Sequence, residues 1–461
     1  MRFILYVAIL LAAIPFAVYA VPPNTGTDVT VCAPGSSDVC YLSDLNGVNQ
    51  PLDTQTRGLA VPNRLIESDM NMFMNPGQLM NYGTAYLEGW LGANLVWGGA
   101  TVPLPANQKL AVFVRRPLNA NSALGSTQAL FDKYAQTGHL TNGLTGFDGS
   151  FTGADLAILN KTTKGFGNLD LMYGMALGDL NLGLRVSYAN MRNNVDQSVA
   201  ATGVNGKYTM SAHNIGVGVG AQWKNLGPGY LDLSLSSDLP LMNMEYNATT
   251  TTGAENLTVR SSAAPSIGLL GRYVTPVGQD RLLVAANIDQ YKMPYEIRGT
   301  NLAGSVKSQD AAASALNLQL DAAYHQNFQD GKLKVIYSTG IGHTSVKYTV
   351  VDNNNPAALN NSYDKNHLFV PVGVAVEHAT FETLKTRFGV RKNVFSSRTT
   401  TDKTTAQTIE TSRAFYQDDE LTVAMGLGWV PAEKVNLDFA MNANAFKLDT
   451  FFAALSARYH Y

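Results

Sequence analysis

Large apolar residues alternate with polar or small residues along much of this chain. Residues 435–441 show the pattern clearly, because every second side chain is large and apolar in the run VNLDFAM. The same alternation recurs in residues 180–189, 316–325 and 368–377. A period of two is typical of strands that have one apolar and one polar face. The sequence therefore predicts an all-β protein.

The length of these runs separates a soluble sandwich from a membrane-spanning barrel. Sandwich strands average about five or six residues, whereas the runs here extend to about nine to twelve, the length that a tilted strand needs to cross hydrocarbon. Strands span a membrane only as a closed barrel, because an open edge would leave backbone groups unpaired in lipid. We predict a transmembrane antiparallel β-barrel of about 14 to 16 strands over residues 82–461.

Short and long connections alternate between these strands, as they do in outer-membrane barrels with tight periplasmic turns and long surface loops. Tight turns are expected at Pro105–Gln108, Gly178–Asp179, Asn225–Gly229, Pro276–Asp280, Gln329–Lys332, Thr380–Thr383 and Ala432–Lys434. Long polar loops are expected over residues 119–166, 192–207, 245–256, 298–310, 352–366 and 397–412. An even number of strands puts both chain ends on the periplasmic side.

The first twenty residues resemble an export signal. Met1–Arg2 gives a positive start, residues 3–16 are almost entirely apolar, and small or β-branched side chains precede a cleavage site after Ala20. A membrane anchor is the alternative, but about fourteen apolar residues are short for a helical span. Residues 1–20 are therefore interpreted as a signal peptide.

Export would place Cys32 and Cys40 in an oxidising compartment. Pro34 and Gly35 between them favour a reversal of the chain, so we expect a structural disulfide that closes this small loop. A short loop stabilises only modestly. A redox or metal role would need further ligands, and the neighbouring sequence offers none.

Residues 21–81 separate the signal from the first convincing strand and are rich in Pro, Gly, Asn and Asp. The stretch is longer than a simple lead-in requires. Such a segment can sit inside a barrel as a plug or hatch, and a periplasmic tail is the alternative. The predicted organisation is a signal peptide over residues 1–20, an N-terminal periplasmic or plug segment over residues 21–81, and the barrel over residues 82–461.

Composition and charge exclude several classes of protein. Charged residues make up 15% of the 461, and 33 basic against 35 acidic residues give a formal net charge of −2. Soluble globular proteins carry about 25% charged residues, and nucleic-acid binders are basic, so neither a cytosolic domain nor a nucleic-acid partner is expected. The run from Gly216 to Gly220 lacks the spacing of a nucleotide loop and is explained by small inward residues. Without catalytic or metal motifs, we expect no enzyme, no metal and no cofactor.

The end of the chain carries a specific signal. Alternating apolar residues run from Phe451 to a terminal aromatic residue, Tyr461. This resembles the last strand by which the barrel-assembly machinery recognises bacterial outer-membrane proteins. The resemblance implies that this machinery is a partner and that the protein resides in the outer membrane of a Gram-negative bacterium.

A second resemblance concerns one family. The motif Asn75-Pro76-Gly77 precedes a predicted strand over residues 84–91, followed by strands over residues 95–104 and 109–116 and then a long loop. This arrangement resembles the long-chain fatty acid transporter family of the outer membrane, which usually has Ala at the third motif position. The resemblance implies a fourteen-stranded barrel closed by an N-terminal hatch. It also implies hydrophobic substrates that are collected at a groove in the surface loops and leave through the barrel wall.

The long loop over residues 119–166 contains more apolar surface than exposure to water favours. The candidate residues are Leu130, Phe131, Tyr134, Phe147 and Phe151. The loop could fold on itself as a lid, line a groove for an apolar ligand, or dip into the lumen and narrow a pore. Only the groove requires a hydrophobic substrate.

Charged residues are predicted to face the lumen. Lys385, Arg387 and Arg391 share one face of a strand. The acidic candidates on inward faces are Asp170, Asp321, Glu377 and Asp438. Facing rows of opposite charge can select ions in a pore, and the alternative is that these groups pair with one another and with plug residues.

The predicted function is passive uptake of small, hydrophobic compounds through an outer-membrane channel. One alternative is a general diffusion porin for hydrophilic solutes. Another is a structural or adhesive surface protein that the barrel anchors. The expected partners are outer-membrane lipids and lipopolysaccharide around the barrel, the assembly machinery, and a small-molecule solute.

Overall fold

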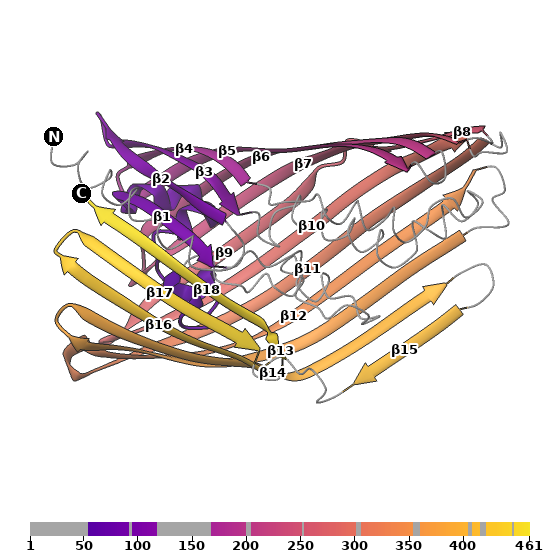
Figure 1. The fold of residues 1–461 in the computed structure, drawn as a ribbon. Helices are drawn as coiled ribbons and strands as arrows, with labels where there is room; N and C mark the ends of the chain where they lie inside the picture. Colours follow the sequence, from indigo (N-terminus) through magenta and orange to yellow (C-terminus); the bar gives the residue numbers. More distant parts are fainter. Residues whose placement is uncertain are drawn as a thin grey trace.

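Most of the chain forms one closed sheet (Figure 1). The computed structural model describes residues 54–91, 95–117, 167–199, 204–250, 253–300, 306–353, 360–403, 408–414, 421–444 and 447–461. Successive strands pair in antiparallel fashion, and β1 (Thr84–Leu91) pairs with β18 (Lys447–His460) to close the ring. The fold is therefore a closed antiparallel β-barrel, which confirms the all-β prediction.

The wall is taller on one side of the barrel than on the other. Short strands come from the two ends of the described chain: β2 (Leu95–Leu104), β3 (Gln108–Pro117), β4 (Gly167–Leu177), β16 (Leu421–Ala432) and β17 (Val435–Asn444). Long strands lie between them: β5 (Leu180–Val199), β6 (Val204–Leu226), β7 (Gly229–Thr250), β10 (Asp280–Thr300), β11 (Val306–Phe328), β12 (Leu333–Asp352), β13 (Asn360–Phe381) and β14 (Leu384–Lys403). The remaining elements of the wall are β8 (Gly253–Ser261), β9 (Ser266–Val277), η4 (Gln329–Gly331) and β15 (Thr408–Ala414).

At two positions in the wall, a pair of shorter strands takes the place of one strand. β8 and β9 both lie between β7 and β10, and β15 and β16 both pair with β14. Among the described residues, the eighteen strands therefore occupy sixteen positions around the ring (18 − 2 = 16). This count is the upper end of the predicted range and replaces the fourteen strands that the family resemblance implied.

The tight turns lie where the sequence predicts them. For example, β4 ends at Leu177 and β5 begins at Leu180, with Gly178 at a φ of 61° between them. Gly227 and Gly278 have the same left-handed backbone in the turns before β7 and β10. This conformation carries no steric cost for glycine, so these three residues allow the chain to reverse within a few positions.

The long connections are shorter than predicted. Strands extend into five of the six stretches expected as loops: β5 continues to Val199, and β6 begins at Val204. The eight long strands consequently reach 20 to 23 residues. A strand ladder needs only backbone groups, so pairing continues beyond the level at which the apolar alternation stops. The sixth stretch, residues 119–166, lies outside the described residues.

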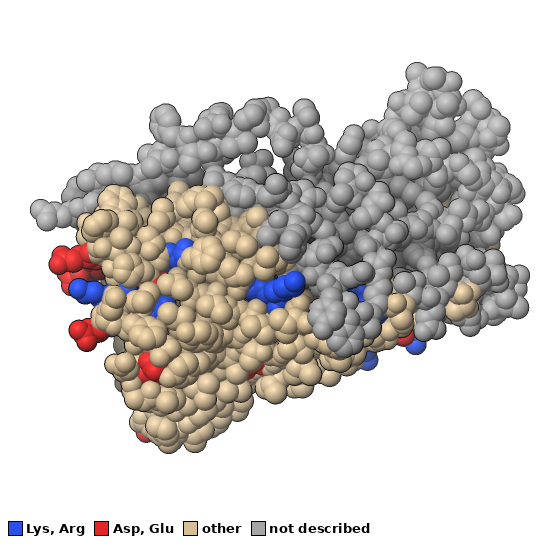
Figure 2. All heavy atoms as spheres, turned by 90° about the horizontal axis from the view of Figure 1, so that it is seen from below, with Lys and Arg blue, Asp and Glu red and all other residues tan. Residues whose placement is uncertain are grey.

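The two faces of the wall differ as the alternation predicts. On β11, the outward side chains of Leu318 and Leu320 are 37% and 51% exposed, while Asn317, Gln319 and Asp321 face inward and are buried. Figure 2 shows few charged side chains on the described part of the face that it presents. Among the described residues, no helix is long and apolar enough to cross a membrane.

The residues that precede β1 lie inside the ring. This N-terminal segment, residues 54–83, contains four short helices: α3 (Thr54–Arg57), η2 (Asn63–Leu65), α4 (Asn71–Met74) and η3 (Pro76–Asn81). The helix η3 contacts β3 to β6, η2 contacts β10 and β11, and α3 contacts β16 to β18. These contacts come from several sides of the wall, and Figure 1 shows the helices in indigo among the strands at one end of the barrel.

Candidate functional site

One cross-strand row of polar side chains faces the N-terminal segment. Asn181 of β5 is opposite Gln222 of β6. Gln222 is opposite Asp232 of β7, which in turn is opposite Arg272 of β9. Directly opposed residues point to the same side of a sheet, so these four side chains, the polar row, reach the lumen at one level. Each is at most 3% exposed and therefore needs a hydrogen-bond partner.

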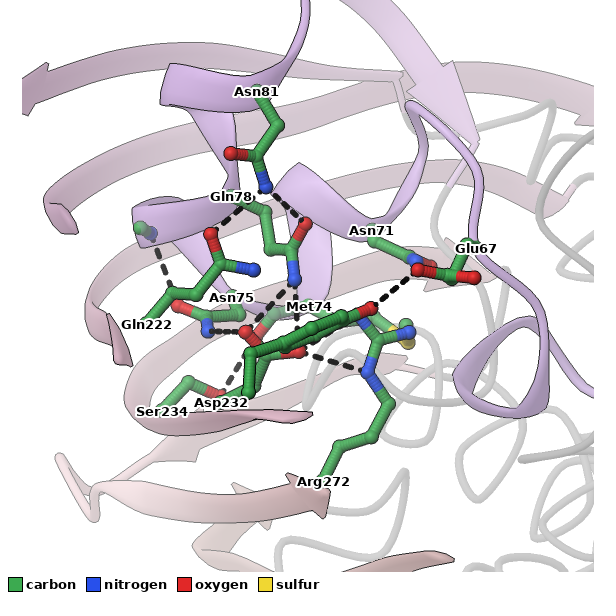
Figure 3. Close-up of polar contacts among 12 residues, drawn as sticks. Glu67, Asn71, Met74, Asn75, Gln78, Asn81, Gln222, Asp232, Ser234 and Arg272 are labelled. Carbon is green, nitrogen blue, oxygen red and sulfur yellow. Dashed lines mark hydrogen bonds and ion pairs between the residues drawn. The ribbon is translucent and has the colours of Figure 1, made fainter. Parts of the chain in front are cut away.

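Asp232 is the centre of the polar row (Figure 3). The amide nitrogen of Gln78 donates to both carboxylate oxygens at 2.8 Å, and that of Asn75 donates at 3.2 Å. From the wall, Arg272 Nε donates to Asp232 at 2.9 Å, and its NH2 nitrogen lies 2.7 Å from the same carboxylate. One carboxylate thus joins two side chains of the segment to an arginine of the wall.

Amides extend this contact toward β5 and β6. The Asn81 side chain donates to Gln78 Oε1 and to Gln222 Oε1, both at 2.9 Å. Asn181 donates to the same Gln222 oxygen at 3.0 Å and to Asn81 at 3.3 Å. Amide groups of the wall and of the segment therefore alternate in one network.

Two glycines of the wall leave room for the motif Asn75-Pro76-Gly77. A Cβ atom on Gly220 would lie 2.0 Å from Asn75 Oδ1, and one on Gly183 would lie 2.1 Å from the Pro76 carbonyl carbon. These glycines oppose each other on β6 and β5 and form a notch. Asn75 caps η3 by accepting from the backbone N–H of Gly77 at 3.0 Å, and proline suits the first turn of a helix.

A second notch on the far side of the ring holds the start of the segment. A Cβ atom on Gly389 of β14 would lie 1.8 Å from the Leu59 carbonyl oxygen. Gly58 and Gly426 of β16 also approach closely, because a Cβ on Gly58 would lie 3.0 Å from the Gly426 Cα. The wall is therefore shaped to the backbone of the segment at two separate places.

Ion pairs join the middle of the segment to the wall. Arg64 Nε lies 2.6 Å from Asp321 Oδ2 on β11, and Asp69 Oδ1 lies 3.0 Å from the NH1 nitrogen of Arg458 on β18. All four side chains are at most 5% exposed. Separating such a pair is unfavourable, because a buried charge without its partner raises the free energy of the folded chain.

Glu67 forms a third pair nearer to the solvent. It pairs with Arg281 and accepts from the Tyr230 hydroxyl at 2.8 Å. Burial alone would raise the pKa of the Glu67 carboxyl, but Arg281, the Tyr230 hydroxyl and Arg272 together hold that pKa below its ordinary value. Glu67 is therefore ionised at neutral pH.

Glu88 of β1 binds the start of the segment. Its carboxylate accepts from the backbone N–H of Thr54 at 3.0 Å and from the Thr54 hydroxyl at 2.7 Å. It also accepts from Trp97 Nε1 at 3.2 Å and from the Tyr86 hydroxyl. Four donors thus hold a carboxylate with no exposed surface beside two aromatic rings.

An apolar cluster lies between the segment and the short strands β1 to β4. Its members are Met70, Met72, Phe73 and Leu79 of the segment and Tyr86, Trp97, Ala111, Phe113 and Met172 of the wall. The ring of Phe73 meets the ring of Phe113 edge-on, with centroids 4.8 Å apart, and that of Trp97 at 6.0 Å. Edge-on packing is a favoured aromatic geometry.

The wall beside this cluster contains a β-bulge. Phe113 of β3 is opposite Asp170 of β4, and the next pair is Arg116 opposite Asn168. Two residues of β3 therefore lie between these pairs, against one residue of β4, and Arg115 has a φ of 57°. An extra residue of this kind disturbs the ladder and turns the following side chain to the other face.

The bulge brings Arg116 into the lumen, where strict alternation would point it outward. Its guanidinium donates to Asp170 through Nε at 2.7 Å and NH2 at 3.0 Å. It also lies 4.7 Å from the centre of the Phe73 ring. Arg115 takes the outward position and is exposed. The irregular part of the wall is thus bridged from inside by one ion pair that touches the apolar cluster.

Three of the charged residues that were predicted to face the lumen pair with one another. Arg387 Nε lies 2.6 Å from Glu377, and its NH1 nitrogen pairs with Asp438. Lys385 precedes it on the same face and is exposed, and Arg391 is half-buried. The contacts are those of the pairing alternative. A role in ion selectivity stays a prediction that neutral replacements of Arg387 and Arg391 would test.

The remaining site predictions fall in different places. The motif Asn75-Pro76-Gly77 lies where the segment meets the wall. Asp170 and Asp321 face inward, each paired with an arginine. Outside the described residues lie Leu130, Phe131, Tyr134, Phe147 and Phe151 of the loop and the pair Cys32 and Cys40. Within the described residues, no group of three or more His, Cys, Asp and Glu side chains is placed to hold a metal.

Several residues of the site were missed from the sequence. Gln78 and Asp232 carry the central contact, and Glu88 and Arg458 bind the segment from the other side. The sequence did contain a signal, because Gly183 and Gly220 fall at inward positions of alternating strands. It does not say which of the many inward polar residues would meet the segment.

Comparison with known proteins finds similar solved structures and no matching sequence family. No protein-family model matches the chain, and no curated protein matches it. The CymD monoaromatic hydrocarbon channel aligns at a TM-score of 0.42 and 8% identity, covering 90% of this chain and 98% of that one. A Pseudomonas aeruginosa FadL homologue aligns at 0.42 and 12%, covering 88% and 98%. The Pseudomonas putida toluene transporter TodX aligns at 0.41 and 9%, covering 88% and 97%.

Proposed function

We propose that this chain is an outer-membrane channel for passive uptake of small hydrophobic compounds, with the N-terminal segment as its hatch. The observation that carries the proposal is the apolar cluster. Its methionine and aromatic side chains form a buried apolar strip inside the barrel. A second apolar cluster joins Leu59, Val61, Leu65 and Ile66 of the segment to β9 to β13, and the rest of the inward face is rich in polar groups. Barrels for hydrophilic diffusion have a polar interior, so an apolar strip in the lumen favours an apolar cargo.

The outer surface supports a membrane location. Large apolar side chains are exposed around the ring, for example Leu171 at 45%, Val217 at 44%, Ile341 at 48% and Val374 at 43%. Apolar surface of this extent is not stable in water and is the expected surface in lipid. The export signal and the terminal strand favour the outer membrane among bacterial membranes.

The hatch role is supported by how the segment is seated. The wall provides two glycine notches and ion pairs from β10, β11 and β18. A periplasmic tail would need none of these fitted contacts. We propose that an apolar solute moves along the apolar cluster, where it breaks no ion pair.

The bulge in β3 lies at the end of that route. We propose that a solute passes between the segment and β1 to β4 and leaves through the wall near Arg116. Met70, Met72 and Met172 suit this role, because methionine side chains adapt to ligands of different shape. Collection of the solute by the loop residues 119–166 is part of the proposal and rests on the sequence alone.

The full mature chain in lipid vesicles tests the proposal. We expect uptake of labelled toluene and of a labelled long-chain fatty acid to exceed that of protein-free vesicles, with no swelling in L-arabinose. If vesicles that contain the unmodified chain swell in arabinose, the chain is instead the alternative, an open porin. A chain that moves neither kind of solute would leave the anchored surface protein as the better explanation.

A further inference from the structure

The N-terminal segment divides into two parts that differ in charge. Residues 54–69 contain Arg57, Arg64, Glu67 and Asp69, whereas residues 70–83 contain no charged residue. We call residues 54–69 the anchor and residues 70–83 the latch. Separating a buried ion pair leaves two unpaired charges, while separating neutral groups leaves none. The two parts are therefore held to the wall with different strength.

The anchor forms ion pairs with the wall. Arg64 of the anchor neutralises Asp321, which is 2% exposed, and Asp69 pairs with Arg458, which is 5% exposed. Glu67 adds a third pair at the rim. If the anchor moved away, Asp321 would stay in the lumen wall without its arginine. Displacing the anchor thus creates unpaired charge on both surfaces.

The latch binds a wall pair that is already neutral. Asp232 and Arg272 lie on adjacent strands of the wall and pair at 2.7 Å, so this ion pair requires no group of the latch. The latch adds only amide groups, from Asn75 and Gln78, to this pair. If the latch moved away, Asp232 would keep its arginine. Water in the lumen would replace two amide donors at modest cost.

The other latch contacts are neutral on the side of the segment, although two wall partners, Arg185 and Lys109, are cations that bind latch carbonyls. Ser234 donates to the carbonyl of Met74 at 2.7 Å, and Lys109 donates to the carbonyl of Tyr82 at 2.7 Å. Gly83, the last latch residue, accepts from the backbone N–H of Tyr461 at 3.1 Å. The latch therefore leads from the anchor to the edge of the barrel, with both of its ends fixed.

We infer that the hatch opens by release of the latch alone, while the anchor stays bound to the wall. This inference rests on the proposed function as a hatched channel. Asp232 and Arg272 act as positioning residues that hold each other while the latch is away and offer it the same seat on return. All four side chains that the segment contributes to the apolar cluster belong to the latch. Release of the latch therefore opens the apolar route and leaves the ion pairs intact.

Hydrogen exchange of the full chain in nanodiscs tests the division directly. We expect backbone amides of residues 70–83 to exchange at least about tenfold faster than those of residues 54–69, which corresponds to about 1.4 kcal/mol. Equal exchange in the two parts, or slower exchange in the latch, would overturn the inference.

A substitution that adds a charge without changing the size of the side chain tests the contact between the latch and Asp232. Gln78→Glu places a second carboxylate against Asp232, and like charges at this distance repel. We expect faster exchange in residues 70–83 only, and more frequent opening events in a planar bilayer, each by about tenfold. Adding Asp232→Asn again leaves one carboxylate beside Arg272. The double variant should therefore show wild-type exchange in residues 70–83 and a wild-type frequency of openings. Release of the anchor by Gln78→Glu, or no rescue by the double variant, would contradict the inference.

A reversible cross-link between the latch and β5 tests whether transport requires release of the latch. In a background with Cys32 and Cys40 replaced by serine, Asn81→Cys and Asn181→Cys are bridged by a short, reducible thiol cross-linker. Uptake of labelled toluene should fall about tenfold and return after reduction. Each single cysteine treated with the same reagent is the control. Full uptake with the bridge in place would show that the latch does not move.

These measurements separate the two proposals. Exchange and conductance report on the segment without any solute. If the unmodified chain takes up neither toluene nor fatty acid, yet the latch exchanges faster than the anchor, the proposed cargo fails and the division of the segment stands. If uptake is normal and the two parts exchange together, the proposed function stands and the division fails.

Discussion

The two sides of the lumen hold the N-terminal segment by different chemistry. Toward β1 to β4, the segment packs through the apolar cluster, in which rings and methionines touch. Toward β5 to β13, polar contacts are added to apolar ones. The segment meets the polar row, the glycine notch and Asp321 there, and Leu59, Val61 and Leu65 pack in a second apolar cluster. Apolar contacts can be exchanged for an apolar ligand without leaving any group unpaired, whereas polar contacts cannot. Substitutions on the two sides should therefore have different effects.

Breaking an ion pair on the polar side should have the largest effect. Arg64→Met leaves the buried Asp321 carboxylate without its cation and, among the described residues, with only the Gln319 amide as a donor. Removing one partner of a buried ion pair costs about 3–5 kcal/mol. We expect residues 54–69 to lose protection from hydrogen exchange and the channel to conduct ions persistently. Adding Asp321→Leu removes the stranded charge and should recover most of the protection. A single variant as well protected as the wild type would mean that the pair does not hold the segment.

Filling the glycine notch should have the next largest effect. Gly220→Ala puts a Cβ 2.0 Å from Asn75 Oδ1, and overpacking of this kind costs about 1–3 kcal/mol. We expect a clear increase in channel openings in a planar bilayer. Gly218→Ala is the matched control on the same face of β6, because its Cβ would have no neighbour closer than 3.7 Å. Equal behaviour of the two variants would argue against a fitted seat.

A change on the apolar side should alter uptake and leave ion conductance as it is. Phe113→Leu removes the edge-on contact with Phe73, and such aromatic contacts contribute about 0.5–1.5 kcal/mol. Uptake of labelled toluene should change a few-fold at low solute concentration. Phe388→Leu, on the outward face and 43% exposed, should have no effect. The comparison between the two sides would lose its basis if Phe113→Leu changed conductance and spared uptake.

The smallest effect is expected from moderate acid. The pKa of Glu67 in the folded chain lies below its ordinary value, so its pair with Arg281 contributes fully above the ordinary Glu pKa of about 4.3. That contribution is lost only as the pH falls through the lowered pKa. Exchange of residues 54–69, corrected for the intrinsic rate, should therefore be unchanged between pH 8 and pH 5. Loss of protection within this window would mean that another group controls the anchor.

The barrel could be predicted because alternation reports on strands whose two faces differ in polarity. Residues such as Leu318 and Leu320 mark strands by their apolar side chains on the outward face, and glycines such as Gly178 mark the turns. The upper parts of the long strands could not be predicted. In the stretch up to Val199, the period of two disappears from the sequence, although the backbone ladder continues.

The site could be predicted only in part, because its contacts join residues far apart in the chain. The Asn75-Pro76-Gly77 motif could be recognised from the sequence because it directly precedes the first predicted strand. Its partner Asp232 lies more than a hundred positions away and looks like any inward acid. Arg116 was hidden for a different reason, since strict alternation assigns it to the outer face until a bulge is known.

The pairing of β1 with β18 makes the first and last strands neighbours. Each of them contributes one buried charged group to the segment: Glu88 of β1 binds Thr54, and Arg458 of β18 binds Asp69. The register places these strands so that Glu88 is opposite Ser456 and Tyr86 is opposite Arg458. A seam that closed one residue out of step would turn either group away from the lumen. The contacts of the segment through Thr54 and Asp69 therefore depend on the register in which β1 and β18 close the ring.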